Sequence, residues 1–247
     1  MFTESDGNSR FELKYRLSYF NYLKIRNMIN SYMKKDSFTL SAGPKGYLVR
    51  SLYYDTYDYK AYMEKMSGDC DRIKFRIRSY ADTVREDTPI RVELKVRKAN
   101  RVEKYSTFVK GAELSYFEQH RTWLNLGDPV LSEFSRHLVL KNLRPQIITE
   151  YTREGFKSHL NDDLRITIDH EVRSAHAKRL FPENVLFRQH HPLTLVLEIK
   201  FKAFQPAWLK ELVHSYGLKL IANSKFTQGI QVARKDLHHP GGVVVVR

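Results

Sequence analysis

The stretches Arg72-Ile-Lys-Phe-Arg-Ile-Arg78 and Arg91-Val-Glu-Leu-Lys-Val-Arg97 decide the fold class, because apolar and charged side chains alternate strictly in both. Successive side chains of a β-strand point to opposite faces, so each stretch predicts a strand with one apolar and one cationic face. Residues 10–17 and 197–202 repeat the pattern. One interpretation is a sheet with a solvated charged face. However, such a face usually mixes charge signs, and like charges on neighbouring strands repel. We therefore expect these cations to face an anion.

Further segments complete the predicted sheet. Residues 47–55, 104–109, 146–153 and 164–171 also have strand character, which gives about eight strands. Short loops such as 99–102 favour hairpins and antiparallel pairing. A sheet of about eight strands can close into a barrel with room for a ligand. The sequence thus predicts an α+β fold, an antiparallel β-barrel or tunnel whose charged faces point inward and whose apolar faces pack on flanking helices.

The helices that would cover the apolar strand faces are also predicted by the sequence. Apolar residues at helical spacing predict helices near 18–35, 112–124, 131–140, 205–216 and 224–234, with Ser18 and Ser224 as N-caps. No linker or change of composition divides the chain. We therefore expect a single domain over residues 1–247.

Composition and charge exclude several classes of protein. The 247 residues are 42% hydrophobic, which suits a folded core, and carry a net charge of +14. A single cysteine permits no internal disulfide and fits a reducing compartment, so we expect a cytoplasmic protein. The polar first ten residues and the lack of a long apolar run predict neither a signal peptide nor a membrane span. Nucleic acid is the usual partner of so basic a chain. Here the cations alternate along strands instead of forming one exposed patch, so nucleic acid is not expected.

Eight motifs in chain order resemble a known family. They are Arg10-Phe-Glu-Leu-Lys-Tyr15, Val49-Arg-Ser-Leu-Tyr-Tyr-Asp-Thr56, Lys74-Phe-Arg-Ile-Arg-Ser-Tyr80, Val92-Glu-Leu-Lys95, Glu150-Tyr-Thr-Arg153, Leu164-Arg-Ile-Thr-Ile-Asp169, Leu197-Glu-Ile-Lys200 and Ser224-Lys-Phe226. Together they resemble the polyphosphate polymerase domain of the vacuolar transporter chaperone (VTC) family, a branch of the triphosphate tunnel metalloenzymes, or CYTH superfamily. That superfamily opens on Glu-x-Glu-x-Lys. Arg10 stands at the first Glu, a departure that is typical of the VTC branch.

The resemblance implies an ATP-dependent polyphosphate polymerase that moves the γ-phosphate of ATP onto a polyphosphate chain, with Mn²⁺ or Mg²⁺ as cofactor. By position, it implies catalytic phosphate ligands at Lys14, Arg76, Arg78, Lys95, Arg153 and Arg165, further substrate contacts at Lys104, Lys200, Lys225, Glu12 and Glu93, and a metal ligand at Glu198. The chemistry agrees, because phosphoryl transfer needs positioning and charge stabilisation more than a nucleophilic side chain. Mg²⁺ usually takes one or two carboxylates plus phosphate oxygens. Glu12 and Glu93 have an alternative role as partners of neighbouring cations.

Other interpretations stay open. The same tunnel suits an inorganic triphosphatase, which Arg10 disfavours, or a non-catalytic polyphosphate-binding module. Expected partners are ATP and inorganic polyphosphate or triphosphate, and a membrane-associated partner protein is left open. Asp169 is as much a candidate ion-pair partner as a metal ligand. Arg72 and Lys74 are expected in solvent at the tunnel mouth. Arg50 and Asp55 are expected to be structural, Asp55 by fixing a turn. The adjacent pairs His190-His191 and His238-His239 do not favour zinc.

Overall fold

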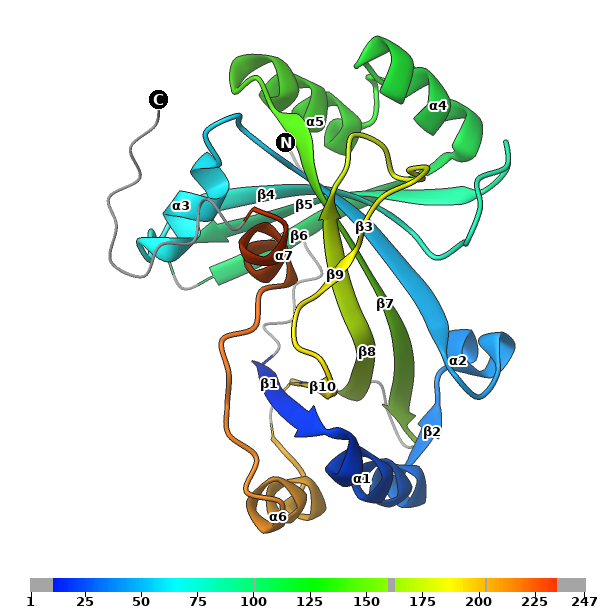
Figure 1. Cartoon of the computed structure of the whole chain (residues 1–247), viewed down its shortest axis with the longest axis vertical. Helices are drawn as coiled ribbons and strands as arrows, with labels where there is room; N and C mark the ends of the chain where they lie inside the picture. Colours follow the sequence, from blue (N-terminus) through cyan, green and yellow to red (C-terminus); the bar gives the residue numbers. More distant parts are fainter. Residues whose placement is uncertain (1–10, 100, 160–162, 203, 235–247) are drawn as a thin grey trace.

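One antiparallel sheet with helices at both ends organises the chain (Figure 1). The computed structural model describes residues 11–99, 101–159, 163–202 and 204–234. The strands are β1 (Phe11–Ser18), β2 (Met33–Lys35), β3 (Tyr47–Asp55), β4 (Arg72–Ser79), β5 (Pro89–Lys98), β6 (Arg101–Lys110), β7 (Arg144–Ser158), β8 (Leu164–His176), β9 (Arg188–Gln189) and β10 (Thr194–Phe201). The helices are α1 (Tyr19–Tyr32), α2 (Ser37–Ala42), α3 (Lys60–Met66), α4 (Gly111–His120), α5 (Pro129–Leu140), α6 (Ala207–Ser215) and α7 (Lys225–Ala233).

The main strands follow the order β1-β10-β8-β7-β3-β4-β5-β6, while β2 pairs with β7 and β9 with β8. The sheet is curled, since Lys14 on β1 and Lys74 on β4, whose strands lie far apart in this order, reach adjacent residues. Lys14 Nζ donates to the Asn223 carbonyl over 3.1 Å, and Lys74 Nζ lies 3.3 Å from Ser224 Oγ. The predicted antiparallel, tunnel-like sheet is therefore confirmed, but it is curled and not closed. Among the described residues no ladder joins β1 to β6. Instead, the free edge of β1 takes another partner, since the Ile221 N–H donates to the Lys14 carbonyl over 2.8 Å.

The apolar strand faces point outward, as the alternation predicts. Phe75 and Ile77 of β4 pack in one core with residues of α4 and α5, including Phe117 and Phe134. Residues of β10, β8 and β1 form a second core with α1 and α6. Figure 1 shows α4 and α5 at one end of the sheet and α1 and α6 at the other. The charged side chains are thereby left on the concave face.

Helix ends follow local capping chemistry. The Ser18 side chain accepts the Asn21 N–H at the start of α1, and the Ser224 side chain accepts the Thr227 N–H at the start of α7, as expected. The helix predicted to reach residue 35 stops at Tyr32, because residues 33–35 form β2 and pair with β7. No helix in the described ranges is both long and apolar enough to cross a bilayer. The segment 235–247, which includes His238 and His239, lies outside the described residues.

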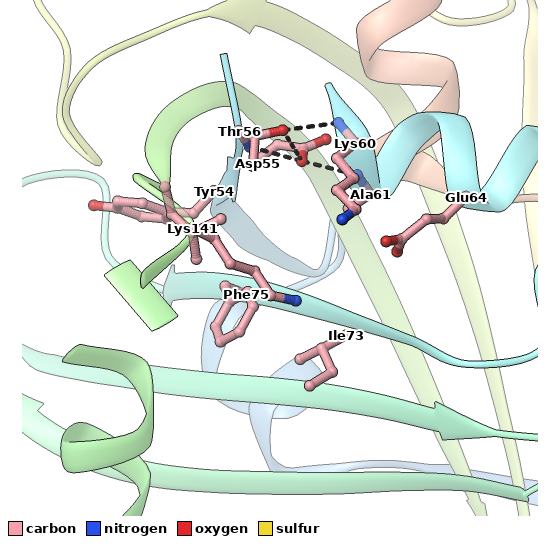
Figure 2. Close-up of a pocket in the computed structure, with 10 residues that line it drawn as sticks. Tyr54, Asp55, Thr56, Lys60, Ala61, Glu64, Ile73, Phe75 and Lys141 are labelled. Atoms are coloured by element: carbon pink, nitrogen blue, oxygen red, sulfur yellow. Dashed lines mark hydrogen bonds between the residues drawn. The ribbon is translucent and has the colours of Figure 1, made fainter. Parts of the chain in front are cut away.

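Asp55 fixes the turn from β3 into α3, as predicted. Its carboxylate accepts the backbone N–H groups of Thr56, Ala61 and Tyr62 over 2.8–3.1 Å. Figure 2 shows this turn beside a small pocket. Ile73 and Phe75, on the outward face of β4, line the pocket, so it lies on the opposite side of that strand from Arg76.

Candidate functional site

The concave face of the sheet gathers the predicted site residues, and we call this surface the trough. Its charged residues are Glu12 and Lys14 of β1, Glu198 and Lys200 of β10, Arg165 and Asp169 of β8, Arg153 of β7, Lys74, Arg76 and Arg78 of β4, Arg91, Glu93 and Lys95 of β5, Lys104 of β6 and Lys225 of α7. Strands β4 and β5 carry charged side chains at alternate positions, which point to one face of the curled sheet and so line a single channel.

Glu198 lies at the centre of one cluster. Its Oε1 is 3.1 Å from Lys225 Nζ and 3.6 Å from Lys14 Nζ. Its Oε2 is 3.4 Å from Arg153 and 4.0 Å from Lys200. Burial by itself raises the pKa of a carboxyl, but here Lys225 and then Arg153 hold the pKa of Glu198 well below its ordinary value. Glu198 is thus a buried anion surrounded by four cations.

Asp169 shares two of those cations. Arg153 donates to both of its oxygens, over 2.6 and 2.8 Å, and Lys225 Nζ lies 2.5 Å away. The side chain is fully buried, and against the effect of burial Arg153 and Lys225 lower its pKa. Of the two roles left open for Asp169, the structure shows the ion pair. Two carboxylates therefore fix Arg153 and Lys225 from both sides.

Glu93 anchors a second cluster, on β5. Its Oε2 accepts Arg76 Nε over 2.5 Å, and its Oε1 lies 2.5 Å from Lys104 Nζ. Arg78 and Arg91 lie 3.9 Å away. Although burial opposes it, Arg76 and then Arg78 keep the pKa of Glu93 below its ordinary value. The predicted phosphate ligands Arg76 and Lys104 are thus oriented by one buried carboxylate.

The position of Lys74 differs from the one expected. Its predicted place was in solvent at the tunnel mouth, but its Nζ is 3.3 Å from Ser224 Oγ and 4.8 Å from the centre of the Phe226 ring. Burial, and then the neighbouring charge of Lys95, lowers the pKa of Lys74 to about 7. The sequence could not reveal this position, because the cover is α7, which comes some 150 residues later in the chain. Arg72 stays near the surface.

Two further predicted residues, Arg165 and Glu12, form their ion pairs with groups other than Glu198. Arg165 shares the face but pairs with Asp36 over 3.0 Å. Glu12 lies 3.2 Å from Lys14 and 3.7 Å from Lys200, so it bridges the outer lysines.

Tyrosines that the charge pattern does not indicate complete the trough. Arg76 donates to the Tyr53 hydroxyl and Arg78 to the Tyr151 hydroxyl, each over 3.4 Å. The Tyr53 ring is buried, which by itself raises its pKa, but Arg76 reverses the effect and lowers it. Tyr151 lies two positions before Arg153 on β7, and residues two positions apart in a strand share a face. The alternation that indicated the cations therefore also indicates this tyrosine.

Residues judged structural lie elsewhere. Arg50 is on the outward face and pairs with Glu150 over 2.5 Å, as expected. His190 is buried and hydrogen-bonded to Ser174 over 2.7 Å. Within the described residues no group of three His, Cys, Asp or Glu side chains is arranged to hold a metal.

The chain is similar to one protein family and to several solved structures. The VTC domain family matches residues 9–234. A solved structure described as a putative adenylate cyclase from Bacillus halodurans superposes with a TM-score of 0.53 at 13% identity, over 88% of this chain and 94% of that one. A second putative adenylate cyclase, from Vibrio parahaemolyticus, gives a TM-score of 0.47 at 13% identity, over 90% and 98% of the chains. The Mimivirus capping enzyme triphosphatase gives 0.34 at 11% identity, over 87% and 90%. No curated protein matches the chain.

These similarities differ in what they show. At 13% identity the Bacillus halodurans structure shows a shared fold and nothing finer. The family match is broader evidence, because it spans every described strand, from β1 to β10, and α7 as well. The resemblance carried by the sequence motifs is thereby confirmed: this chain belongs to the VTC domain family.

Proposed function

We propose that this protein is a metal-dependent polyphosphate polymerase that transfers the γ-phosphate of ATP onto a growing polyphosphate chain. One observation carries the proposal. Lys74, Lys95 and Lys104 lie directly opposite one another on β4, β5 and β6. Among the described residues, neither Lys74 nor Lys95 has a carboxylate within ion-pairing distance. Like charges at directly opposed positions destabilise a sheet, so a bound polyanion is the natural counter-charge for this row.

The arginines of the trough suit a phosphoryl group. A guanidinium offers planar, paired donors that match phosphate oxygens. Glu93 orients Arg76, and Asp169 orients Arg153, before any substrate binds. Such preorganised charges stabilise a transferring phosphoryl group without reorganising during the reaction.

The proposed step needs no covalent protein intermediate. A terminal oxygen of the polyphosphate attacks the γ-phosphorus, and the bond from that phosphorus to the β–γ bridging oxygen breaks. The products are ADP and a chain one phosphate longer. The charge that develops on the bridging and peripheral oxygens is stabilised by the surrounding Arg and Lys side chains.

A divalent metal fits this donor set only together with a phosphate ligand. All four cations around Glu198 repel a metal ion, and both carboxylate oxygens already face them. A bound triphosphate would draw these cations toward its own oxygens and free Glu198 for a metal. Mg²⁺ and Mn²⁺ are commonly held by one or two carboxylates together with substrate phosphates. The metal would supply charge neutralisation at the phosphate oxygens.

The test is to incubate the purified protein with ATP and Mn²⁺ and to separate the products on a gel stained for polyphosphate. We expect a ladder of chains together with ADP, and neither product from the Glu198→Gln variant. Free phosphate without chains would replace the proposal with a triphosphatase. A protein that binds neither ATP nor polyphosphate would refute it.

A further inference from the structure

Three aromatic rings from separate segments meet beside the trough. Phe38 comes from α2, Tyr47 begins β3 and Tyr80 follows β4. Their ring centres lie 5.6 Å (Phe38–Tyr47), 6.0 Å (Phe38–Tyr80) and 5.9 Å (Tyr47–Tyr80) apart. We call these three rings the aromatic platform. The role proposed above does not use them.

The platform borders the arginine part of the trough. Tyr47 is opposite Arg153 in the β3–β7 register. Tyr80 follows directly after the end of β4, two residues beyond Arg78. Burial by itself raises the pKa of the Tyr80 hydroxyl, but the positive charge of Arg78 reverses the effect and lowers that pKa. The row formed by Lys74, Lys95 and Lys104 lies toward the other end of the trough. Tyr80 is six positions beyond Lys74, which corresponds to about 20 Å along a strand.

The outermost ring of the platform is both exposed and held in place. The Phe38 residue is 57% exposed, whereas Tyr47 is only 8% exposed, so Phe38 rests on the tyrosines and presents a free surface to solvent. Asp36 caps the short helix that carries Phe38 by accepting the Thr39 N–H over 2.9 Å, and it also pairs with Arg165. An exposed, anchored phenyl ring next to phosphate-binding arginines has the chemistry to stack on a flat, uncharged ring attached to a phosphate chain.

We infer that the aromatic platform stacks on the base of a nucleoside triphosphate whose phosphates lie on Arg78 and Arg153. The inference rests on the proposed function and adds how the donor is recognised. Ring stacking accepts any base, because every base has a π-face. ATP and GTP are therefore expected to bind almost equally well, both better than inorganic triphosphate, which has no base.

The test compares two ligands on two variants. Phe38→Ala should raise the Kd for ATP by about fivefold to a hundredfold, the range that removal of a base-stacking ring gives. The Kd for inorganic triphosphate should stay unchanged, and Phe38→Trp should restore ATP binding. Leu40→Ala is the matched control, because Leu40 is 67% exposed on the same helix but is not part of the platform. The Kd values are measured by calorimetry without metal.

The outcomes separate the inference from the function it rests on. Loss of ATP affinity alone supports the platform. An unchanged ATP affinity in Phe38→Ala, or an equal loss for both ligands, overturns the platform and leaves triphosphate binding in place. Failure of the wild-type protein to bind either ligand overturns the proposed function as well.

Discussion

Glu198→Gln should tighten metal-free binding of triphosphate while abolishing metal-dependent turnover. The change removes one negative charge and keeps the side chain's shape. Lys14, Arg153, Lys200 and Lys225 lie 3.1–4.0 Å from the carboxylate oxygens, so a phosphate bound to them would sit close to the Glu198 charge. Two like charges about 6 Å apart repel by about 3 kcal/mol at an effective dielectric constant of about 20. With a reduction for salt and solvent, the gain is about 1–2 kcal/mol, or about 5-fold to 30-fold in Kd.

The assay is calorimetric titration with inorganic triphosphate in the presence of a chelator. Glu103→Gln is the matched control. It removes the same charge from β6 but on the outward face, where Glu103 accepts a hydrogen bond from Tyr105. The control should leave the Kd unchanged. Weaker triphosphate binding by Glu198→Gln, in a protein that melts like the wild type, would refute the electrostatic reasoning.

Three further experiments test other parts of the trough. Arg76→Ala combined with Arg78→Ala should weaken triphosphate binding by about 3–6 kcal/mol, since a hydrogen bond to a charged group contributes about 1.5–3 kcal/mol; an unchanged calorimetric Kd would contradict a role in phosphate binding. Lys74→Met should weaken binding more at pH 6 than at pH 8.5, because the pKa of Lys74 is lowered to about 7 and only its protonated form attracts phosphate. Lys74→Arg should bind without that pH difference, and equal losses for Lys74→Met at both pH values would oppose the argument. Gly229→Ala should lower both the melting temperature and the affinity for triphosphate. A Cβ at this position would lie 2.8 Å from side-chain atoms of Ile147 and Ser174, so α7, which carries Lys225, would be pushed off the sheet. Gln231→Ala, farther along the same helix, should change neither quantity.

The sequence predicts the strands well where a single rule governs them. A strand with one buried face must alternate, and the pattern in residues 72–78 and 91–97 gives the ends of β4 to within one residue and those of β5 to within two. The same rule places Arg76, Glu93 and Lys95 on one face. The family motifs then select most of the residues that the structure brings together in the trough.

The remaining features depend on contacts between distant segments. Residues 33–35 continue a helical pattern but become β2, because β7 offers them a ladder. Closure of the sheet could not be judged from strand patterns, since the edge of β1 pairs with a loop more than 200 residues away. Nor does alternation tell which carboxylate meets which cation. Asp169 and Glu198 share Lys225 only because α7 returns to the sheet at the end of the chain.

The seam between β1 and β6 has a mechanical consequence for a long polymer. A ring closed by backbone hydrogen bonds must be threaded by a free end. Here the strand order ends at β1 on one side and β6 on the other, and among the described residues the backbone at the free edge of β1 pairs with the segment around Leu220 and Ile221 and not with β6. Parting such a seam breaks no ladder between the two edge strands. If the trough binds polyphosphate, as proposed, the polymer does not have to be threaded by one end and is able to enter or leave sideways, through this seam, from the middle of its length.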